Sequence, residues 1–300
     1  MNMTETSPTP ISSEIYRRFR SLGEWQTWTS THGYIFSQKH AQGLLRQIRE
    51  QGLVDPLTKT AHHPGDILVS GDNYRDTIRS GALTSRHRAV LFEWQRLASN
   101  GLPHLSSRGC KVYAPEGLTE FALFLRGRFP KFIGSEYAQT EEERRVLFPI
   151  PGEDLHALSF PGGVFDLVIS NEVFEHLPDL DRALREIARV LNASGALIAT
   201  FPFLFNRERG IVKARLAGDG VEHLAEPEYH GNPMRPEEGS LVFELPGWDI
   251  LERARAAGFG DAYISFIASA RHGVLAKDVG GVLVFVARKE ESGTGGPGPG

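Results

Sequence analysis

The chain has 300 residues, of which 40% are hydrophobic and 23% are charged, as is typical of a soluble globular protein with one large or two modest domains. Its formal net charge of -4 provides no basic surface for nucleic-acid phosphates, so we expect no nucleic-acid partner. A single cysteine, Cys110, excludes an internal disulfide and a cysteine-based zinc site and favours a reducing compartment. Because no apolar run resembles a signal peptide or a membrane span, we expect a cytoplasmic protein without membrane contact.

The N-terminal third has helical periodicity. Residues 1–10 and 291–300 hold too few apolar residues to offset the entropy of ordering, so we expect both ends to be disordered. Between residues 11 and 106 the periodicity predicts a mostly helical region that serves as a lid or makes substrate or dimer contacts. Its three helical stretches read SEIYRRFRSL, SQKHAQGLLRQIREQGL and RHRAVLFEWQRLASNGL.

Residues 107–290 alternate between short β-branched runs and helical patterns. Such alternation predicts an α/β domain with a mainly parallel sheet that is covered on both faces. No helical pattern separates the last two runs, which we expect to pair antiparallel. The expected strands read KVY, KFIGSE, LFPI, FDLVIS, ALIATFPF, DAYISFIAS and GVLVFVAR.

Residues 111–137 predict a strand, a turn, a helix and a second strand, which is the layout of a nucleotide-binding βαβ unit. Gly117 lies in the turn, where the missing Cβ permits close approach and the backbone N–H groups face a polar ligand. Glu136 ends the second strand, 19 residues after Gly117, near the spacing at which a carboxylate accepts hydrogen bonds from ribose hydroxyls. Asp154 lies in a later loop, where it is placed to accept from an exocyclic amine while the Leu155 N–H donates to a ring nitrogen.

The segment FDLVISNEVFEHLPD followed by RALREIARVLNASG predicts a buried strand, a loop and an amphipathic helix. This segment resembles the class I S-adenosylmethionine-dependent methyltransferases of the small-molecule, type 11 group. The resemblance covers residues 111–288. It implies a doubly wound, seven-stranded, mainly parallel sheet of the Rossmann-like methyltransferase fold, with strand order 3-2-1-4-5-7-6, a helical N-terminal region and an insertion at residues 206–240.

The resemblance also implies a cofactor site for S-adenosylmethionine, with S-adenosylhomocysteine as the product. In that family the acidic end of the second strand binds ribose, an acidic loop residue binds adenine, and the backbone after the fourth strand holds the methionine moiety. The corresponding residues here are Ala114, Glu116, Gly117, Glu136, Tyr137, Asp154, Leu155, Ser170 and Asn171.

The first turn departs from the family pattern. Tyr113, Pro115 and Thr119 stand where the family has an acidic residue and two glycines. We expect Glu116 to replace the missing carboxylate and to bind the amino group of the cofactor. A turn of this kind tolerates proline, because the fixed φ of proline suits many turn positions.

Three histidines are the candidates for catalysis. His176 follows the fourth strand, where it would serve as a general base or only pack the cofactor loop. His223 and His230, together with Tyr229, lie in the insertion, and either contact the acceptor or form surface turns. We expect no metal site, because the adjacent His62 and His63 point in different directions.

The main hypothesis is O- or N-methylation of a small-molecule acceptor, for which an intermediate of specialised metabolism is one candidate. The altered first turn leaves two alternatives. One is an enzyme that holds S-adenosylmethionine or S-adenosylhomocysteine as a structural part while it catalyses a cyclisation or an elimination. The other is a non-catalytic partner protein. Either a homodimer or a complex with a partner protein is compatible with the sequence.

Overall fold

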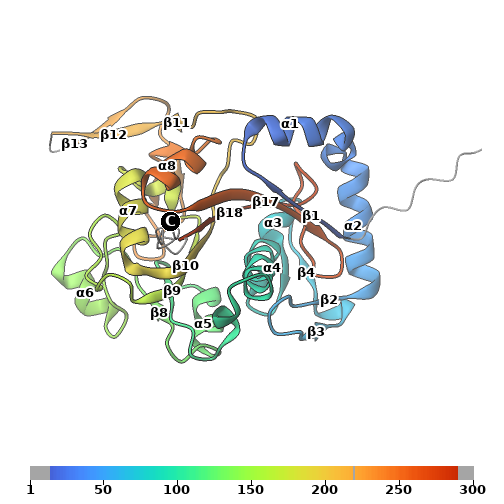
Figure 1. Ribbon diagram of the computed structural model, residues 1–300, viewed down its shortest axis with the longest axis horizontal. Coiled ribbons are helices and arrows are strands. Elements are labelled where there is room, and N and C mark those ends of the chain that lie inside the picture. The colour runs from blue at the N-terminus through green and yellow to red at the C-terminus, as the bar shows by residue number, and fades with distance from the viewer. Residues whose placement is uncertain (1–13, 219, 290–300) are drawn as a thin grey trace, which may run out of the picture.

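The computed structural model describes residues 14–218 and 220–289, and the predicted disordered ends lie outside these residues. Six strands that the sequence predicts lie side by side in one sheet (Figure 1). They are β7 (Val112–Ala114), β8 (Ile133–Gly134), β9 (Phe165–Asn171), β10 (Leu191–Thr200), β17 (Asp261–Ser269) and β18 (Val282–Arg288). No helix in the described part of the chain is long and apolar enough to cross a membrane.

The main sheet has seven strands in the order β1-β17-β18-β10-β9-β7-β8. The order of the six core strands agrees with the order implied by the resemblance, once the expected third strand is left out. β8, β7, β9 and β10 run parallel, whereas the other three strand pairings are antiparallel. The predicted antiparallel pairing of the last two strands is therefore confirmed, and the description of the sheet as mainly parallel is too strong.

The strand predicted at LFPI does not form. Leu147 instead ends helix α6 (Glu141–Leu147), which begins with a capping box between Thr140 and Glu143. Pro149 has no N–H with which to continue a ladder. In place of the expected strand, Gly152 forms an isolated parallel bridge with Glu136, just beyond the end of β8.

The seventh strand comes from the N-terminal region, where the sequence analysis predicted a helix over SEIYRRFRSL. β1 (Glu14–Phe19) pairs antiparallel with β17 along its whole length. The Tyr16 and Tyr263 hydroxyls, one from each strand, both donate to the buried Glu93 carboxylate, at 3.1 and 2.6 Å. Six residues are too few for periodicity to separate a strand from a helix, so this prediction was wrong.

Helices cover both faces of the sheet (Figure 1). α1 (Leu22–Thr31), α2 (Gln38–Gln51), α7 (Leu180–Val190) and α8 (Ile250–Ala256) pack on one face. α4 (Ser85–Ser99) and α5 (Glu120–Arg126) pack on the other face. The predicted helices at α2, α4 and α7 are confirmed, which makes this a three-layer α/β structure.

Short elements fill the N-terminal region between α2 and β7. They are β2 (Leu53–Val54), β3 (Ala61–His62), η2 (Pro64–Asp66), β4 (Leu68–Val69), α3 (Tyr74–Thr77), β5 (Ile78–Ser80) and β6 (Leu83–Thr84), with η1 (Gly33–Phe36) before α2 and η3 (Pro103–Ser106) after α4. The region is therefore less helical than the sequence suggests.

The insertion after β10, expected at residues 206–240, extends to Leu245 and is built from short antiparallel strand pairs. Its strands are β11 (Ile211–Val212), β12 (Ala214–Ala217), β13 (Gly220–His223), β14 (Tyr229–His230), β15 (Ser240–Leu241) and β16 (Glu244–Leu245). The β12–β13 hairpin projects away from the body of the protein (Figure 1). β14 and β15 fold back toward η4 (Phe174–His176), because Phe243 N–H donates to the Glu175 carbonyl at 2.7 Å.

Arg88 joins the N-terminal region to the C-terminal hairpin. Its guanidinium is fully buried in α4 and donates to the carbonyls of Leu83, Ile78 and Gly273, at 2.9, 3.0 and 2.9 Å. Burial lowers the pKa of Arg88 to about 10. The hydrogen bonds satisfy a buried charge with three carbonyls that have no access to water.

We expect Arg88→Met to lower the free energy of unfolding by about 3 kcal/mol or more, because it leaves three buried carbonyls without a donor. Urea denaturation measures this loss. Arg49→Met, on the exposed face of α2, is the matched control and should change stability by less than about 0.5 kcal/mol. Equal stability of the two variants would contradict the bridging role of Arg88.

Candidate active site

The turn after β7 packs directly on the end of β8. The Gly117 N–H donates to the Ser135 carbonyl at 2.8 Å, and the Ser135 N–H donates to the Ala114 carbonyl at 3.0 Å. A Cβ on Gly117 would lie 2.9 Å from the carbonyl carbon of Gly134. A glycine is therefore required here for the contact between two backbone segments, in addition to any contact with a ligand.

Glu136 extends from the end of β8 to this turn. Its Oε1 accepts a hydrogen bond from the Leu118 N–H at 2.9 Å. Burial raises the pKa of Glu136, and the hydrogen bond from Leu118 opposes this rise. One carboxylate oxygen of Glu136, the residue predicted to bind ribose, thus binds the protein's own backbone. The Leu118 N–H, which was expected to face the ligand, is already in use.

Glu116 is buried between the first turn and the end of β9. Its Oε1 accepts from the Asn171 backbone N–H at 3.1 Å and from the Asn171 side-chain amide at 2.6 Å. Burial raises the pKa of Glu116 to about 8, although the Arg86 charge and the Asn171 hydrogen bonds act in the opposite direction. The carboxyl group therefore becomes ionised only slightly above neutral pH.

The remaining predicted cofactor residues lie at the same edge of the sheet or in the loops beyond it. Ala114 is buried at the end of β7, and Tyr137 is exposed just after β8. Asp154 Oδ1 accepts from the His156 N–H at 2.8 Å and contacts the His156 ring at 2.7 Å, next to the buried Leu155. Ser170 lies near the end of β9, where its hydroxyl is buried with no hydrogen-bond partner among the described residues.

Two arginines that the sequence analysis did not predict lie above the end of β9. Arg75 of α3 forms a two-pronged ion pair with Glu172, and Arg86 of α4 lies 3.6 Å from the same carboxylate. Burial is the largest single effect and raises the pKa of Glu172, but the charge and hydrogen bonds of Arg75, together with the charge of Arg86, lower the pKa overall. Glu172 has a φ of 53°, a left-handed conformation that is uncommon outside glycine and clusters at functional sites.

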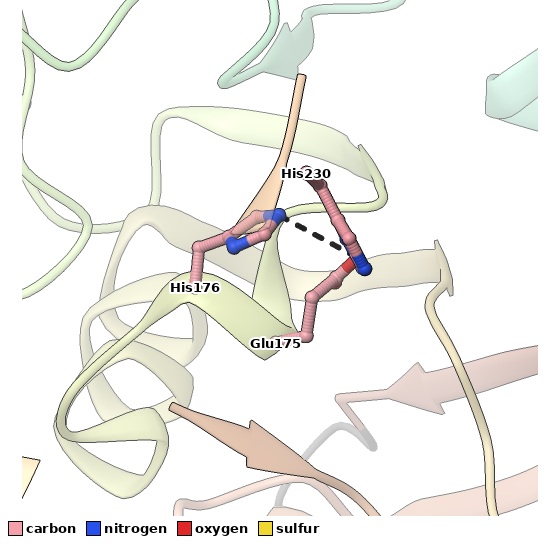
Figure 2. Close-up of side chains that lie close together, drawn as sticks. All are labelled: Glu175, His176 and His230. Atoms are coloured by element: carbon pink, nitrogen blue, oxygen red, sulfur yellow. Dashed lines mark ion pairs between the residues drawn. The ribbon is translucent and has the colours of Figure 1, made fainter. Parts of the chain in front are cut away.

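Two of the three candidate histidines meet a buried glutamate. Figure 2 shows the side chains of Glu175, His176 and His230 pointing toward one another. Glu175 Oε1 lies 3.7 Å from His176 Nε2 and 3.5 Å from His230 Nδ1. Burial, together with the charge of Glu172, raises the pKa of Glu175 to about 8, and burial lowers the pKa of His176. Because burial disfavours both charged forms, the cluster tends toward neutral groups near pH 7.

The structure does not bring His223 to this cluster. Its side chain is exposed at the end of β13, and within the described residues no hydrogen bond or ion pair joins it to Glu175, His176 or His230. The candidate site therefore contains His176 and His230, whereas the role predicted for His223 stays a prediction.

Comparisons with known proteins address the same part of the chain. Residues 130–199 match the family model Methyltransf_11, which describes a methyltransferase domain. This segment is therefore similar to methyltransferase domains. It contains β9, η4 and α7. Glu172 directly follows β9, and Glu175 and His176 lie in η4.

Two curated relatives each match about a quarter of the chain. The chain is 35% identical over 77 residues to the sarcosine/dimethylglycine N-methyltransferase of Halorhodospira halochloris, which is 25% of this chain and 28% of that protein. It is 34% identical over 69 residues to the malonyl-[acyl-carrier protein] O-methyltransferase of Legionella pneumophila, which is 23% of this chain and 24% of that protein. The chain thus spans about a quarter of the length of the curated relatives that it matches.

Among solved structures, the chain is similar to the 1,6-didemethyltoxoflavin-N1-methyltransferase of Burkholderia thailandensis, crystallised with 1,6-didemethyltoxoflavin and S-adenosylhomocysteine. The identity is 15%, and the alignment covers 66% of this chain and 78% of that chain with a TM-score of 0.36.

The sequence contains one signal for the glutamates of the methyltransferase domain that the sequence analysis did not use. Glu172, Glu175 and His176 follow β9 at spacings of three and four residues, and side chains with this spacing point the same way within a helical turn. Arg75 and Arg86 have no such signal, because they lie outside the family match.

We expect Gly117→Ala to lower the free energy of unfolding by about 1–3 kcal/mol, because the added Cβ overlaps the backbone at Gly134. Thermal or urea denaturation measures the change. Gly33→Ala is the matched control, since a Cβ there meets nothing within 4 Å. A Gly117→Ala protein as stable as the control would show that the turn after β7 does not pack on β8 as described.

Proposed function

We propose that the protein is an S-adenosylmethionine-dependent methyltransferase that acts on a small-molecule acceptor by O- or N-methylation. One observation carries this proposal: buried carboxylates lie at the carboxyl ends of two neighbouring strands, Glu116 after β7 and Glu136 after β8. In open α/β sheets, ligands bind outside the carboxyl ends of the strands where the strand order reverses. β7 lies at such a point, between β8 and β9.

The polar groups of this edge fit the parts of S-adenosylmethionine. Glu116 would accept from its ammonium group, and Glu136 would accept from the ribose hydroxyls through the oxygen that Leu118 does not use. Asp154 would accept from the adenine amine. The buried Ser170 hydroxyl, which lacks a partner among the described residues, supplies a further polar contact near the end of β9. A buried polar group without a partner is costly unless a ligand satisfies it.

Arg86 gives this site a cation that the family resemblance did not provide. Its guanidinium lies 3.6 Å from the Glu172 carboxylate and 2.9 Å from the Asp76 carboxylate, and its charge lowers the pKa of Glu116. An amino-acid moiety has both an ammonium and a carboxylate. Glu116 and Arg86 are placed to bind these two groups separately.

S-adenosylmethionine supplies an electrophilic methyl group, so the protein has to align the acceptor and, for a hydroxyl acceptor, remove a proton. His176 fits the second task. Its Nδ1 contacts the Leu241 carbonyl at 2.9 Å and therefore carries the proton, which leaves Nε2 free to accept one. The burial that lowers the pKa of His176 keeps it neutral at neutral pH.

Two hydrogen bonds within the protein favour the alternatives to methyl transfer, which are a non-catalytic partner protein and a non-methylating enzyme. The Leu118 and Asn171 N–H groups, expected to face the cofactor, donate to Glu136 and Glu116. A chain with this arrangement either rearranges these bonds on binding or holds no cofactor at all, as a non-catalytic partner protein. The enzyme that catalyses a cyclisation or an elimination would use the same cofactor site. It would differ from a methyltransferase only because it does not consume S-adenosylmethionine.

Calorimetry with S-adenosylmethionine and S-adenosylhomocysteine tests the proposal first. Saturable binding of both supports a cofactor site, and no binding favours the partner protein. A mass-spectrometric screen of candidate acceptors then separates the two enzymes. Methyl transfer adds a methyl group to the acceptor and releases S-adenosylhomocysteine, whereas a cyclisation or elimination consumes no S-adenosylmethionine.

We expect Glu136→Ala to weaken S-adenosylmethionine binding by about 1–3 kcal/mol, because a charged hydrogen-bond acceptor is lost. This corresponds to a dissociation constant raised roughly 5- to 150-fold, as measured by calorimetry. Glu142→Ala, an exposed carboxylate of α6, should leave it unchanged. An unchanged constant for folded Glu136→Ala would remove Glu136 from the site.

We also expect cofactor affinity to rise with pH up to about pH 8. In the free protein, burial raises the pKa of Glu116 to about 8, against the Arg86 charge, while Glu136 adds a smaller effect in the same direction as burial. Because a bound ammonium favours the ionised carboxylate, binding below pH 8 releases a proton, and the affinity rises by at most about tenfold per pH unit. Glu116→Gln should bind more weakly and lose this slope. The same slope in Glu116→Gln would assign the proton to another group.

A further inference from the structure

The cluster of Glu175, His176 and His230 has the geometry of a metal site. One potential ligand atom from each residue lies within 4.8 Å of the other two. The Glu175 Oε1 is 3.7 Å from His176 Nε2 and 3.5 Å from His230 Nδ1. Two ligand atoms about 2.1 Å from a tetrahedral ion are roughly 3.4 Å apart, so small side-chain shifts would bring these atoms into coordination distance.

The far nitrogen of each imidazole ring already has a partner. His176 Nδ1 contacts the Leu241 carbonyl at 2.9 Å, and His230 Nε2 contacts Glu228 Oε1 at 3.2 Å. These acceptors hold the protons on the far nitrogens, so the lone pairs of His176 Nε2 and His230 Nδ1 face Glu175. Metal-binding histidines typically donate their other N–H to a carbonyl or a carboxylate in this way.

Glu175 gives an independent indication of a missing ligand. Its side chain is fully buried, and neither carboxylate oxygen accepts a hydrogen bond from any residue that the structure describes. Arg75 does not neutralise the Glu175 carboxylate, since it already forms an ion pair with the neighbouring Glu172. A buried carboxylate without hydrogen bonds is strongly unfavourable unless a cation or a proton binds it.

We propose that Glu175, His176 and His230 bind one divalent transition-metal ion. Two imidazole nitrogens and one carboxylate suit Zn²⁺, Fe²⁺, Co²⁺ or Ni²⁺, whereas Mg²⁺ and Ca²⁺ prefer sites made of oxygen ligands. Three protein ligands leave at least one coordination position for water or for an acceptor oxygen. With the ion bound, His176 Nε2 would coordinate it instead of accepting a proton, and the ion would lower the pKa of a coordinated hydroxyl. That link to the acceptor rests on the proposed methyl transfer, but binding of the ion does not.

The family match alone would not assemble this site. Glu175 and His176 come from η4, whereas His230 comes from β14 of the insertion. The insertion is held against η4 by the Phe243 N–H bond to the Glu175 carbonyl and by the contact of His176 with Leu241. The inserted segment thus completes a ligand set that the methyltransferase domain holds only in part.

The test uses the full chain, stripped with a chelator, and Co²⁺ as the probe. Visible absorption reports the coordination of bound Co²⁺, and elemental analysis after gel filtration gives the stoichiometry. We expect one Co²⁺ per chain, displaced by Zn²⁺ but not by an equal concentration of Mg²⁺. No cofactor or acceptor is present, so the result is independent of whether the protein transfers methyl groups.

His176→Gln and His230→Gln should each weaken Co²⁺ binding by about tenfold or more. His63→Gln removes an exposed histidine of the N-terminal region and should bind as the unmodified chain does. Circular dichroism checks folding, and if His176→Gln does not fold, His230→Gln decides. No saturable binding, equal displacement by Mg²⁺, or affinity unchanged in the folded histidine variants would each overturn the proposal.

Discussion

The structure depends on the balance of negative charge at the carboxyl end of β9. Glu116, Glu172 and Glu175 converge there, and two of them are buried. Desolvated carboxylates need cations or donors to be stable. The N-terminal region supplies Arg75 and Arg86, and Asn171 supplies two donors to Glu116. Glu175 is the carboxylate that these groups leave without a hydrogen bond among the described residues, which is why the proposed metal site includes it.

The same balance makes the N-terminal region part of the candidate active site. Arg75 and Arg86 hold α3 and α4 against the residues that follow β9. Arg88, two residues after Arg86, ties α4 to the C-terminal hairpin through the Gly273 carbonyl. β1 then extends the sheet beyond β17 and shares the buried Glu93 with it. Contacts this extensive are expected to limit motion of the region as a separate lid.

Much of the core was predictable from local sequence pattern. β9, β10, β17 and β18 are long apolar runs whose burial on both faces leaves little ambiguity, and α7 has a clear helical period with Asp179 as its cap. The pattern failed where elements are short. LFPI contains a proline that cannot join a ladder, and the residues of β1 become a strand only because β17 offers them a free edge.

For the candidate site, the sequence by itself determined which residues stand at the ends of strands. Strand positions follow from hydrophobic periodicity, so Glu116, Glu136, Ser170 and His176 could be placed at the carboxyl edge without a structure. Only the tertiary structure decided their partners: Arg75 and Arg86 above Glu172, Asn171 on Glu116, and His230 beside Glu175. These pairs join segments about 50 to 100 residues apart, and local pattern contains no information about which distant side chains the packing of the layers brings together.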